Sequence, residues 1–335
     1  MVDLPQNVFR YVLTTSGVHQ LLLSILAAAV FLIELVPLEL QRRIVNDLVK
    51  NRDYRLVIIL CLVYAGIVIV QGAAKLVLNV YRGWVGERAT RDLRKRIQIL
   101  VGAPPDAAPV PEAQGIQVSM IVAEVEPIGG FMGGSISEPL LQGGVLLSML
   151  AYMIHLNPWM ALVAVAIFAP QLVLIPFLQR AIIQRTATRV QILRGLSVSV
   201  VSPGYRDSGH GLADVARIDH VFELDMGIFR LKFTMNFLMN LCNHLQVIAA
   251  LLLGGWYVLS DQLVIGGVVA FISAVGRLND PWGDLVNYFR DLSVTQVRFR
   301  LLANAVNQLT HAGTVNAAGK INGRAAGDSK LDPQL

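Results

Sequence analysis

Six long apolar runs are the feature that most constrains how this 335-residue chain can fold. Each run has 19 to 26 residues, enough for an α-helix to cross the roughly 30 Å hydrocarbon core of a bilayer. Only 15% of the residues are charged, against about 25% in a typical soluble domain. The pattern predicts an all-α, polytopic membrane protein with six transmembrane helices, at Leu21–Leu40, Leu56–Val80, Met132–Ile154, Trp159–Phe177, Phe233–Val258 and Leu263–Val286.

The connections between these runs differ greatly in length and charge. Two are tight turns without Lys or Arg, at 155–158 and 259–262. Two others, 81–131 and 178–232, have about fifty residues each and together carry fourteen Lys and Arg. By the positive-inside rule both long connections and both termini are expected in the cytosol. The connection after the first run disagrees in part, with the basic residues Arg42, Arg43, Lys50, Arg52 and Arg55.

Each long connection has the pattern of a helical hairpin. In the first, Val85, Ala89, Leu93 and Ile97 recur at spacings of four, which places them on one helix face. Prolines and glycines interrupt each connection near its middle and predict a turn there. Two long cytosolic hairpins are therefore predicted, with helices at 81–100 and 115–128 around a turn at 102–111, and at 178–201 and 212–232 around a turn at 202–211.

The sixth apolar run merges into an amphipathic pattern. One helix over 263–302 would measure about 60 Å at 1.5 Å per residue, so it would cross the bilayer and project beyond it. Pro281 is expected to kink this helix without ending it. The residues that share one helix face are Trp282, Leu285, Val286, Phe289 and Leu292.

Four short phrases of sequence occur along these elements. They are Gly115-Ile-Gln-Val-Ser-Met-Ile followed by Glu124-Val125, Asn157-Pro158-Trp159, Gly266-Gly267-Val268-Val269-Ala270-Phe271 and Leu278-Asn279-Asp280-Pro281. In their order and spacing, and with six spans and two long hairpins, the chain resembles the transmembrane domain of ABC exporters. The resemblance covers residues 1–305. Residues 306–335, rich in Gly, Ala, Asn and Asp, are expected to form a disordered cytosolic tail.

The resemblance implies a permease subunit that lines a translocation path and is driven by ATPase partners. In that family the hairpin tips form short coupling helices that seat on the ATP-hydrolysing domains. The implied partners are an ABC ATPase subunit, a second copy of the chain or a homologous six-helix subunit, the lipid bilayer and a transported substrate. ATP and Mg²⁺ belong to the ATPase partner, and the implied location is a bacterial-type inner membrane. The implied coupling residues are Asp106, Glu112, Gln114, Tyr205, Arg206, Asp207 and His210.

The chain itself is not expected to hydrolyse ATP. A P-loop needs G-x-x-x-x-G-K-[ST] between a strand and a helix, so that backbone N–H groups and the Lys hold the phosphates. The nearest match, between Gly313 and Lys320, has one residue too many between its glycines. Ile321 stands where the Mg²⁺-binding hydroxyl should be. No catalytic residue and no cofactor of its own are therefore predicted.

Polar residues inside the apolar runs are candidates for the translocation path, because they are costly in lipid. The three polar residues in 240–244 are alternatively placed to hydrogen-bond between helices. The arginine of the sixth run is alternatively paired with Asp280 or Asp284 along its own helix. Outside this set, Lys75 is expected to snorkel to the inner interface, and Glu138 to lie at the cytosolic end of the third span. The path candidates are Glu34, Asn240, Asn243, His244 and Arg277.

Glycines and cysteines in the apolar runs favour structural roles. Gly129, Gly130, Gly133 and Gly134 form two overlapping GxxxG spacings, which predict close helix packing, with dimerisation as the alternative. The two cysteines lie inside apolar runs, so small core residues are favoured over a disulfide or a metal site. The six histidines show no metal-ligand spacing.

Two other functions remain open beside the ATP-driven permease. One is a membrane scaffold or regulator that has kept the fold and lost transport, favoured by a proline-rich first tip and the missing P-loop. The other is an ion-coupled carrier, which would show broken mid-membrane helices or internal repeats; the sequence makes neither evident. Nucleic-acid binding is disfavoured, because the placement of basic residues in the long connections accounts for the net charge of +5.

Overall fold

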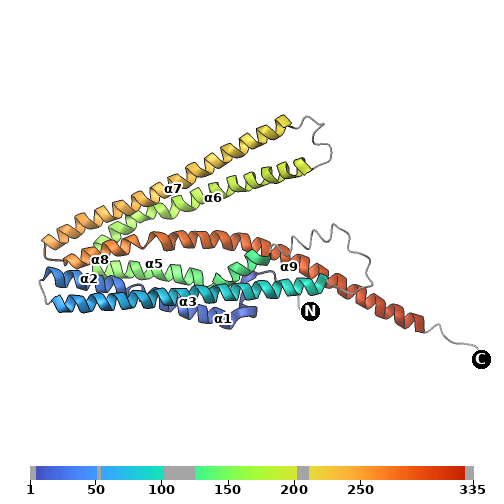
Figure 1. Cartoon of the computed structure of the whole chain (residues 1–335), viewed down its shortest axis with the longest axis horizontal. Coiled ribbons are helices and arrows are strands. Elements are labelled where there is room, and N and C mark those ends of the chain that lie inside the picture. Colours follow the sequence, from blue (N-terminus) through green and yellow to red (C-terminus); the bar gives the residue numbers. More distant parts are fainter. Residues whose placement is uncertain (1–4, 51–53, 102–124, 202–210, 329–335) are drawn as a thin grey trace, which may run out of the picture. The chain divides into compact units, whose positions relative to one another are not determined.

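The computed structural model describes residues 5–50, 54–101, 125–201 and 211–328 (Figure 1). Within these ranges the chain is helical and has no strand, so the predicted all-α class is confirmed. Residues 125–134 form a further helical segment. The helices are α1 (Val8–Ile33), α2 (Val36–Val49), α3 (Tyr54–Val101), α5 (Ser137–Leu156), α6 (Pro158–Val201), α7 (Gly211–Leu259), α8 (Ile265–Gly276) and α9 (Asn279–Asp328).

Within the described ranges, five helical stretches are long and apolar enough to cross a membrane, judged by length and composition. They are Val8–Val49, Tyr54–Ile99, Ser137–Leu156, Pro158–Leu193 and Val215–Leu259. Five of the six predicted spans fall on these stretches. The sixth, 263–286, is divided between α8, which has only 12 residues, and the start of α9. The prediction of six spans is therefore met only in part.

Proline explains why the sixth run is broken. The single helix predicted over 263–302 is wrong, because α8 ends at Gly276 and α9 begins at Asn279. Pro281 has no N–H and cannot donate to the carbonyl of Arg277. In the first turn of a new helix this missing donor costs nothing, since the first four N–H groups have no intrahelical acceptor. Arg277, with φ −96° and ψ 3°, has left the helical conformation.

The same arrangement divides two other predicted runs. The first run breaks at Glu34 and Leu35, before Pro37 in the first turn of α2. The third run breaks at residues 135–136, before Pro139 in the first turn of α5. Each proline is accommodated where its lost N–H is unneeded. Each of the three breaks therefore lies just before a proline that the sequence displays, whereas Pro170 and Pro176 lie inside α6 without breaking it.

The two tight turns occur where they were predicted. At 155–158, the side-chain oxygen of Asn157 accepts hydrogen bonds of 3.0 Å from the backbone N–H groups of Trp159 and Met160, and α6 begins at Pro158. At 259–262, Asp261 adopts φ 56°, a left-handed conformation that Asp tolerates better than most residues. The N–H of Gln262 then donates to the Tyr257 carbonyl at 2.9 Å.

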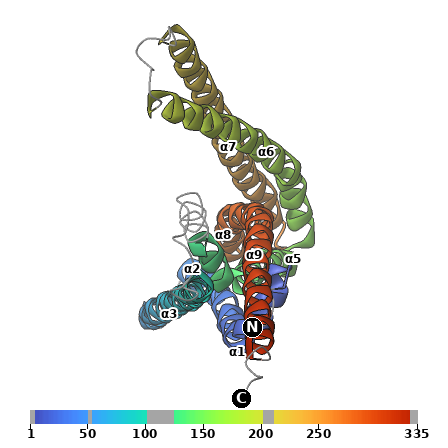
Figure 2. The same ribbon diagram turned by 90° about the vertical axis from the view of Figure 1, so that its right-hand side faces the viewer.

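Three helices continue far beyond their apolar portions. α3 passes Val80 and reaches Val101, α6 passes Phe177 and reaches Val201, and α7 begins 22 residues before Phe233. The helices predicted at 81–100, 178–201 and 212–232 are therefore confirmed. Most of the helix predicted at 115–128, and both tips, lie outside the described residues. α6 and α7 pack against each other, and both views show them side by side (Figures 1 and 2).

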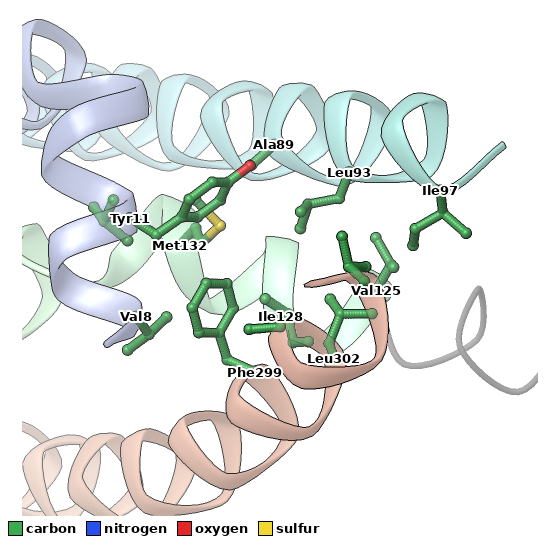
Figure 3. Packing of buried hydrophobic residues seen from close by; sticks show 13 residues of the cluster. Val8, Tyr11, Ala89, Leu93, Ile97, Val125, Ile128, Met132, Phe299 and Leu302 are labelled. Atoms are coloured by element: carbon green, nitrogen blue, oxygen red, sulfur yellow. The ribbon is translucent and has the colours of Figure 1, made fainter. Parts of the chain in front are cut away.

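The chain divides into two compact units, each built from separate segments. The first contains residues 1–37, 62–148 and 281–335. Its core joins α1, α3, residues 125–134 and α9 (Figure 3). Ring centroids of Tyr11 and Phe299 lie 5.3 Å apart at its centre. The core residues are Val8, Tyr11, Val12, Ala89, Leu93, Ile97, Val125, Ile128, Met132, Phe299, Leu302, Ala303 and Val306.

The second unit contains residues 38–61 and 149–280. α7 packs against both α6 and α8 there. Gly254 permits this close approach, because a Cβ at that position would lie 2.8 Å from a methyl of Val268 and 3.2 Å from the terminal carbon of Met160. A small residue on the helix surface lets neighbouring backbones come together, as at other helix contacts in membranes.

α9 extends into the segment expected to be an irregular tail. It continues to Asp328, and residues 329–335 lie outside the described part. No proline lies between Pro281 and Pro333, so no residue in between lacks the N–H donor that a helix requires. The Gly-, Ala- and Asn-rich composition lowers helix propensity but does not block the helix as proline would.

Candidate functional site

The predicted coupling residues cannot be placed. All seven, Asp106, Glu112, Gln114, Tyr205, Arg206, Asp207 and His210, lie outside the described residues. The predicted path residues, by contrast, are all described; Glu34 belongs to the first unit and the other four belong to the second.

Glu34 and Arg277 each mark the end of a helix. Glu34 is the C-cap of α1, and its N–H donates to the carbonyl of Val30 at 3.2 Å. Arg277 is the C-cap of α8 and is half-buried. Among the described residues Arg277 and Asp280 form no ion pair, so the salt bridge considered for Arg277 at i+3 is not present. The two residues also belong to different units.

The polar residues of 240–244 do not share a contact face. Asn240 and His244 are exposed on α7, whereas Asn243 is half-buried. The Oδ1 atom of Asn243 is buried without a hydrogen-bond donor among the described residues. The expected inter-helix hydrogen bond comes instead from Gln246, whose Nε2 donates to the Ala164 carbonyl of α6 at 2.9 Å.

Buried glutamines are the polar residues that the sequence interpretation missed. Gln246 is fully buried, and Gln20 on α1 donates in the same way to the Met132 carbonyl at 2.9 Å. Gln171 on α6 is also buried, and neither atom of its side-chain amide has a partner within the described ranges. For Gln171 and Gln246 the available signal was a glutamine inside an apolar run, which is as costly in lipid as the asparagines that were selected, whereas Gln20 lies one residue before the first run.

The clearest polar constellation lies in the first unit and joins three helices. Arg82 of α3 forms an ion pair with Glu138 of α5, and its Nε donates to the Ser137 hydroxyl at 3.1 Å. Gln142, one turn further along α5, donates through Nε2 to Glu138 at 2.8 Å and to Asp284 of α9 at 2.9 Å. These five side chains are called the polar network below. They link α3, α5 and α9 through charge-assisted hydrogen bonds, which are stronger than neutral ones.

Local sequence explains why the polar network forms at this place. Arg82 follows the apolar part of α3 by two residues, and Glu138 lies in the first turn of α5. A carboxylate is favoured there, because the helix dipole places partial positive charge at the N-terminus. The side chains of Arg82 and Glu138 are only 17% and 24% exposed, so their attraction is less screened than that of a surface pair. Glu138 was expected at this end of the span, but its partner was not identified.

A second link lies beside the polar network. The Tyr288 hydroxyl of α9 donates to the Ser135 carbonyl at 2.5 Å. This carbonyl lacks its usual helical donor, because Pro139 occupies the position four residues later. Tyr288 also stacks on Phe131, with ring centroids 5.7 Å apart. Burial raises the pKa of the Tyr288 hydroxyl above its ordinary value, so the donor stays protonated at neutral pH.

The predicted close packing of the glycine segment is confirmed. A Cβ at Gly133 would collide with the Arg82 carbonyl, and one at Gly129 would collide with the Thr90 side chain. Gly86 of α3 completes the contact, since a Cβ there would lie 3.0 Å from the Gly129 carbonyl. Gly130 meets no atom within 4 Å. One of the two GxxxG spacings, 129–133, therefore allows the helical segment 125–134 to pack closely on α3. This packing lies beside Arg82, the residue of α3 that belongs to the polar network.

A mixed polar hollow adjoins these helices in the first unit. It has a volume of about 420 Å³ and lies between residues 127–131 and α9. Acidic Asp291, basic Arg298 and the hydroxyl of buried Thr295 line it together with Phe131. This lining offers acidic and basic groups beside an aromatic ring. Among the described residues, no three His, Cys, Asp or Glu side chains form a cluster suited to a metal ion.

Comparison with known proteins finds no matching family model, and no curated protein matches the chain. The function is therefore inferred from the residues of the chain and their geometry.

Proposed function

We propose that this chain is the permease subunit of an ATP-driven transporter of the ABC exporter type. In this proposal it lines the translocation path across a bacterial-type inner membrane. A second copy or a homologous six-helix subunit completes the path. ABC ATPase subunits dock on the tips of the two cytosolic hairpins and supply ATP and Mg²⁺.

The observation that carries the proposal is the reach of three helices. α3, α6 and α7 continue for 21, 24 and 22 residues beyond their apolar portions, which corresponds to about 30–36 Å at 1.5 Å per residue. Links between spans need only a few residues, so long helical extensions indicate docking to a partner. The basic residues on these extensions support a cytosolic position for them.

The polar network supports a role in conformational change. It joins helices whose cytosolic continuations would receive force from a docked ATPase. Ion pairs and hydrogen bonds between rigid helices have discrete alternatives, so ligands that bind one arrangement better shift the population toward it. In the proposed cycle, ATP binding to the partners favours one arrangement of α3, α5 and α9, and release after hydrolysis favours the other.

The decisive experiment combines copurification with a coupling variant. The tagged full-length chain is co-expressed with a candidate P-loop ATPase from a neighbouring reading frame and purified in mild detergent, and ATP hydrolysis is measured. Tyr205→Ala and Arg206→Ala are expected to lower hydrolysis in the complex several-fold. His155→Ala, in the tight turn at the opposite end of the spans, is the matched control and should leave hydrolysis unchanged. A chain that stays free of any ATPase under these conditions contradicts the proposal and favours the scaffold or regulator.

An ion-coupled carrier is a second candidate, favoured by one observation. The break at 277–278 interrupts the sixth apolar run, and discontinuous helices hold substrates and ions in such carriers. Uptake into proteoliposomes distinguishes the two. Transport driven by an ion gradient without ATP supports the carrier, whereas a requirement for ATP and the partner supports the permease.

A further inference from the structure

Four side chains of the first unit form a compact surface cluster outside the polar network. His19 comes from α1, whereas Tyr81, Trp84 and Arg88 come from α3. The Tyr81 and Trp84 rings stack with an interplanar angle of 11° and centroids 6.0 Å apart. The His19 ring meets the Trp84 ring edge-on at 5.3 Å. These four residues are called the interfacial cluster.

Hydrogen bonding fixes the proton positions in the interfacial cluster. Arg88 Nη1 lies 3.2 Å from His19 Nε2, and a guanidinium can only donate. Nε2 of His19 is therefore the acceptor, and the ring carries its proton on Nδ1. That proton points to the Tyr81 hydroxyl oxygen, 2.7 Å away. The Tyr81 O–H remains available to donate outward.

The Arg88 guanidinium is oriented and still has unused donors. It lies 5.3 Å from the centre of the Trp84 ring, in the range of a cation–π interaction. Of its five N–H groups, one is directed to His19, and no other acceptor occurs among the residues that the structure describes. The remaining donors suit a phosphate, which arginine binds through two parallel hydrogen bonds. Trp84 itself is 48% exposed, so the cluster is open to a ligand.

The position of the cluster along α3 identifies the kind of ligand. Leu76, Val77 and Val80 present exposed aliphatic side chains immediately before it. Trp84 lies four residues beyond Val80, a rise of about 6 Å, which matches the roughly 5–8 Å thickness of the headgroup layer on each side of a bilayer. From residue 87 to residue 101 the helix carries five basic residues (Arg88, Arg91, Arg94, Lys95 and Arg96) against two acidic ones, Glu87 and Asp92. Apolar, aromatic and basic zones therefore follow one another as the acyl, headgroup and aqueous layers do.

We infer that the interfacial cluster is a binding site for the phosphate of an anionic phospholipid in the cytosolic leaflet. Arg88 and the Tyr81 hydroxyl hold the phosphate oxygens, and Trp84 packs at the level of the glycerol backbone. His19 holds Arg88 in position and does not itself contact the lipid. The site depends on membrane insertion of α3 and is independent of any transport activity.

The test uses tryptophan quenching by brominated lipids in nanodiscs that contain the full chain. The chain has four tryptophans, so the signal of Trp84 is taken as the difference between the unmodified protein and Trp84→Phe. Trp84 should be quenched more strongly by brominated phosphatidylglycerol than by brominated phosphatidylcholine. The difference should correspond to an apparent local concentration of the anionic lipid that is about fivefold higher, the enrichment that one arginine near the surface provides. Arg88→Gln should abolish the excess, whereas Arg91→Gln, which removes the same charge one turn further along α3, should retain it.

Three results would overturn the inference. Equal quenching by the two lipids in the unmodified protein shows that the cluster does not select anionic headgroups. If Arg88→Gln and Arg91→Gln reduce the excess quenching by the anionic lipid equally, the lipid is attracted by a diffuse basic surface and not by a site. Displacement of the anionic lipid by millimolar inorganic phosphate or glycerol phosphate shows that the ligand is a soluble phosphate. Because the first and third comparisons use the unmodified protein, they remain informative if a variant fails to fold.

Discussion

Arg82 of α3 and Glu138 of α5 form an ion pair whose side chains are 17% and 24% exposed. On the same helix, Arg94 pairs with Glu126 at 3.0 Å, and there the side chains are 43% and 72% exposed. The two pairs join α3 to neighbouring helical segments and differ chiefly in burial. Breaking a fully buried pair costs about 3–5 kcal/mol, whereas an exposed pair contributes about 0–1 kcal/mol.

Glu138→Gln should therefore destabilise the protein, since it leaves a half-buried Arg82 without its counter-charge. We expect the free energy of unfolding to fall by about 1–3 kcal/mol, below the fully buried limit because both groups retain some solvent. Glu126→Gln is the matched control and should change it by less than about 0.5 kcal/mol. Denaturant unfolding in detergent measures both. Equal effects of the two variants would show that the buried pair is not special.

The glycine contact makes a separate prediction. Gly133→Ala places a methyl group against the Arg82 carbonyl, where backbone cannot move aside cheaply, and should destabilise by about 1–3 kcal/mol. Gly130→Ala meets open space and should be neutral or stabilising by up to about 1 kcal/mol, through better helix propensity. The same unfolding assay compares the two. If Gly130→Ala is the more damaging change, the face of residues 125–134 that packs on α3 has been misassigned.

Tyr288 provides a prediction on pH. Its folded-state pKa is raised by burial above the unfolded value of about 10. Its contribution to stability is therefore complete below pH 10 and is lost as pH rises through the folded-state pKa. Tyr288→Phe should lower stability by about 1 kcal/mol at neutral pH, with no difference from the unmodified protein above the folded-state pKa.

The measurement for Tyr288 is the unfolding free energy of both proteins from pH 7 to pH 11.5, together with a tyrosinate absorbance titration. The difference titration should reveal a phenol with a pKa above 10. A difference titration centred at or below 10 would contradict the burial of this hydroxyl against Ser135.

Gln171 of α6 tests how the interior of the second unit accommodates a buried polar group. Its amide is buried without a partner among the described residues, and leaving such a group unpaired costs about 1–3 kcal/mol. Gln171→Leu, of similar volume, should therefore raise the melting temperature. Gln246→Leu is the comparison variant, because it removes a formed hydrogen bond to Ala164 and should gain less. A lower melting temperature for Gln171→Leu would show that this amide has a polar partner in the membrane.

Periodicity and length were enough to predict the long helices. The apolar runs located the helical portions of α3, α6 and α7, and the amphipathic spacing at Val85, Ala89, Leu93 and Ile97 predicted that α3 continues beyond the membrane. All four of these residues are buried, and three of them, Ala89, Leu93 and Ile97, belong to the core of the first unit. Helix period is a local property, so it is visible in sequence alone.

The helix breaks and the polar contacts were harder to predict for different reasons. Pro37, Pro139 and Pro281 were visible, but proline both kinks helices and starts new ones, and only the surrounding packing decides between these outcomes. The polar network depends on which helices are neighbours, which sequence spacing does not specify. The contacts that Arg82 and Asp284 make in this network were therefore not predicted, while Asn240 and His244 were selected although they are exposed.

The most direct test of the proposed function is the side of the membrane on which α6 and α7 end. In a chain carrying Cys61→Ser and Cys242→Ser, single cysteines are introduced as Glu223→Cys on the extension of α7 and His155→Cys at the tight turn before α6, both at exposed positions. Intact cells are treated with a membrane-impermeant thiol reagent. The proposal predicts that His155→Cys is labelled in intact cells and that Glu223→Cys is labelled only after permeabilisation. Labelling of Glu223→Cys in intact cells would place the α6–α7 extension where no cytosolic ATPase can reach it, and would contradict the proposal.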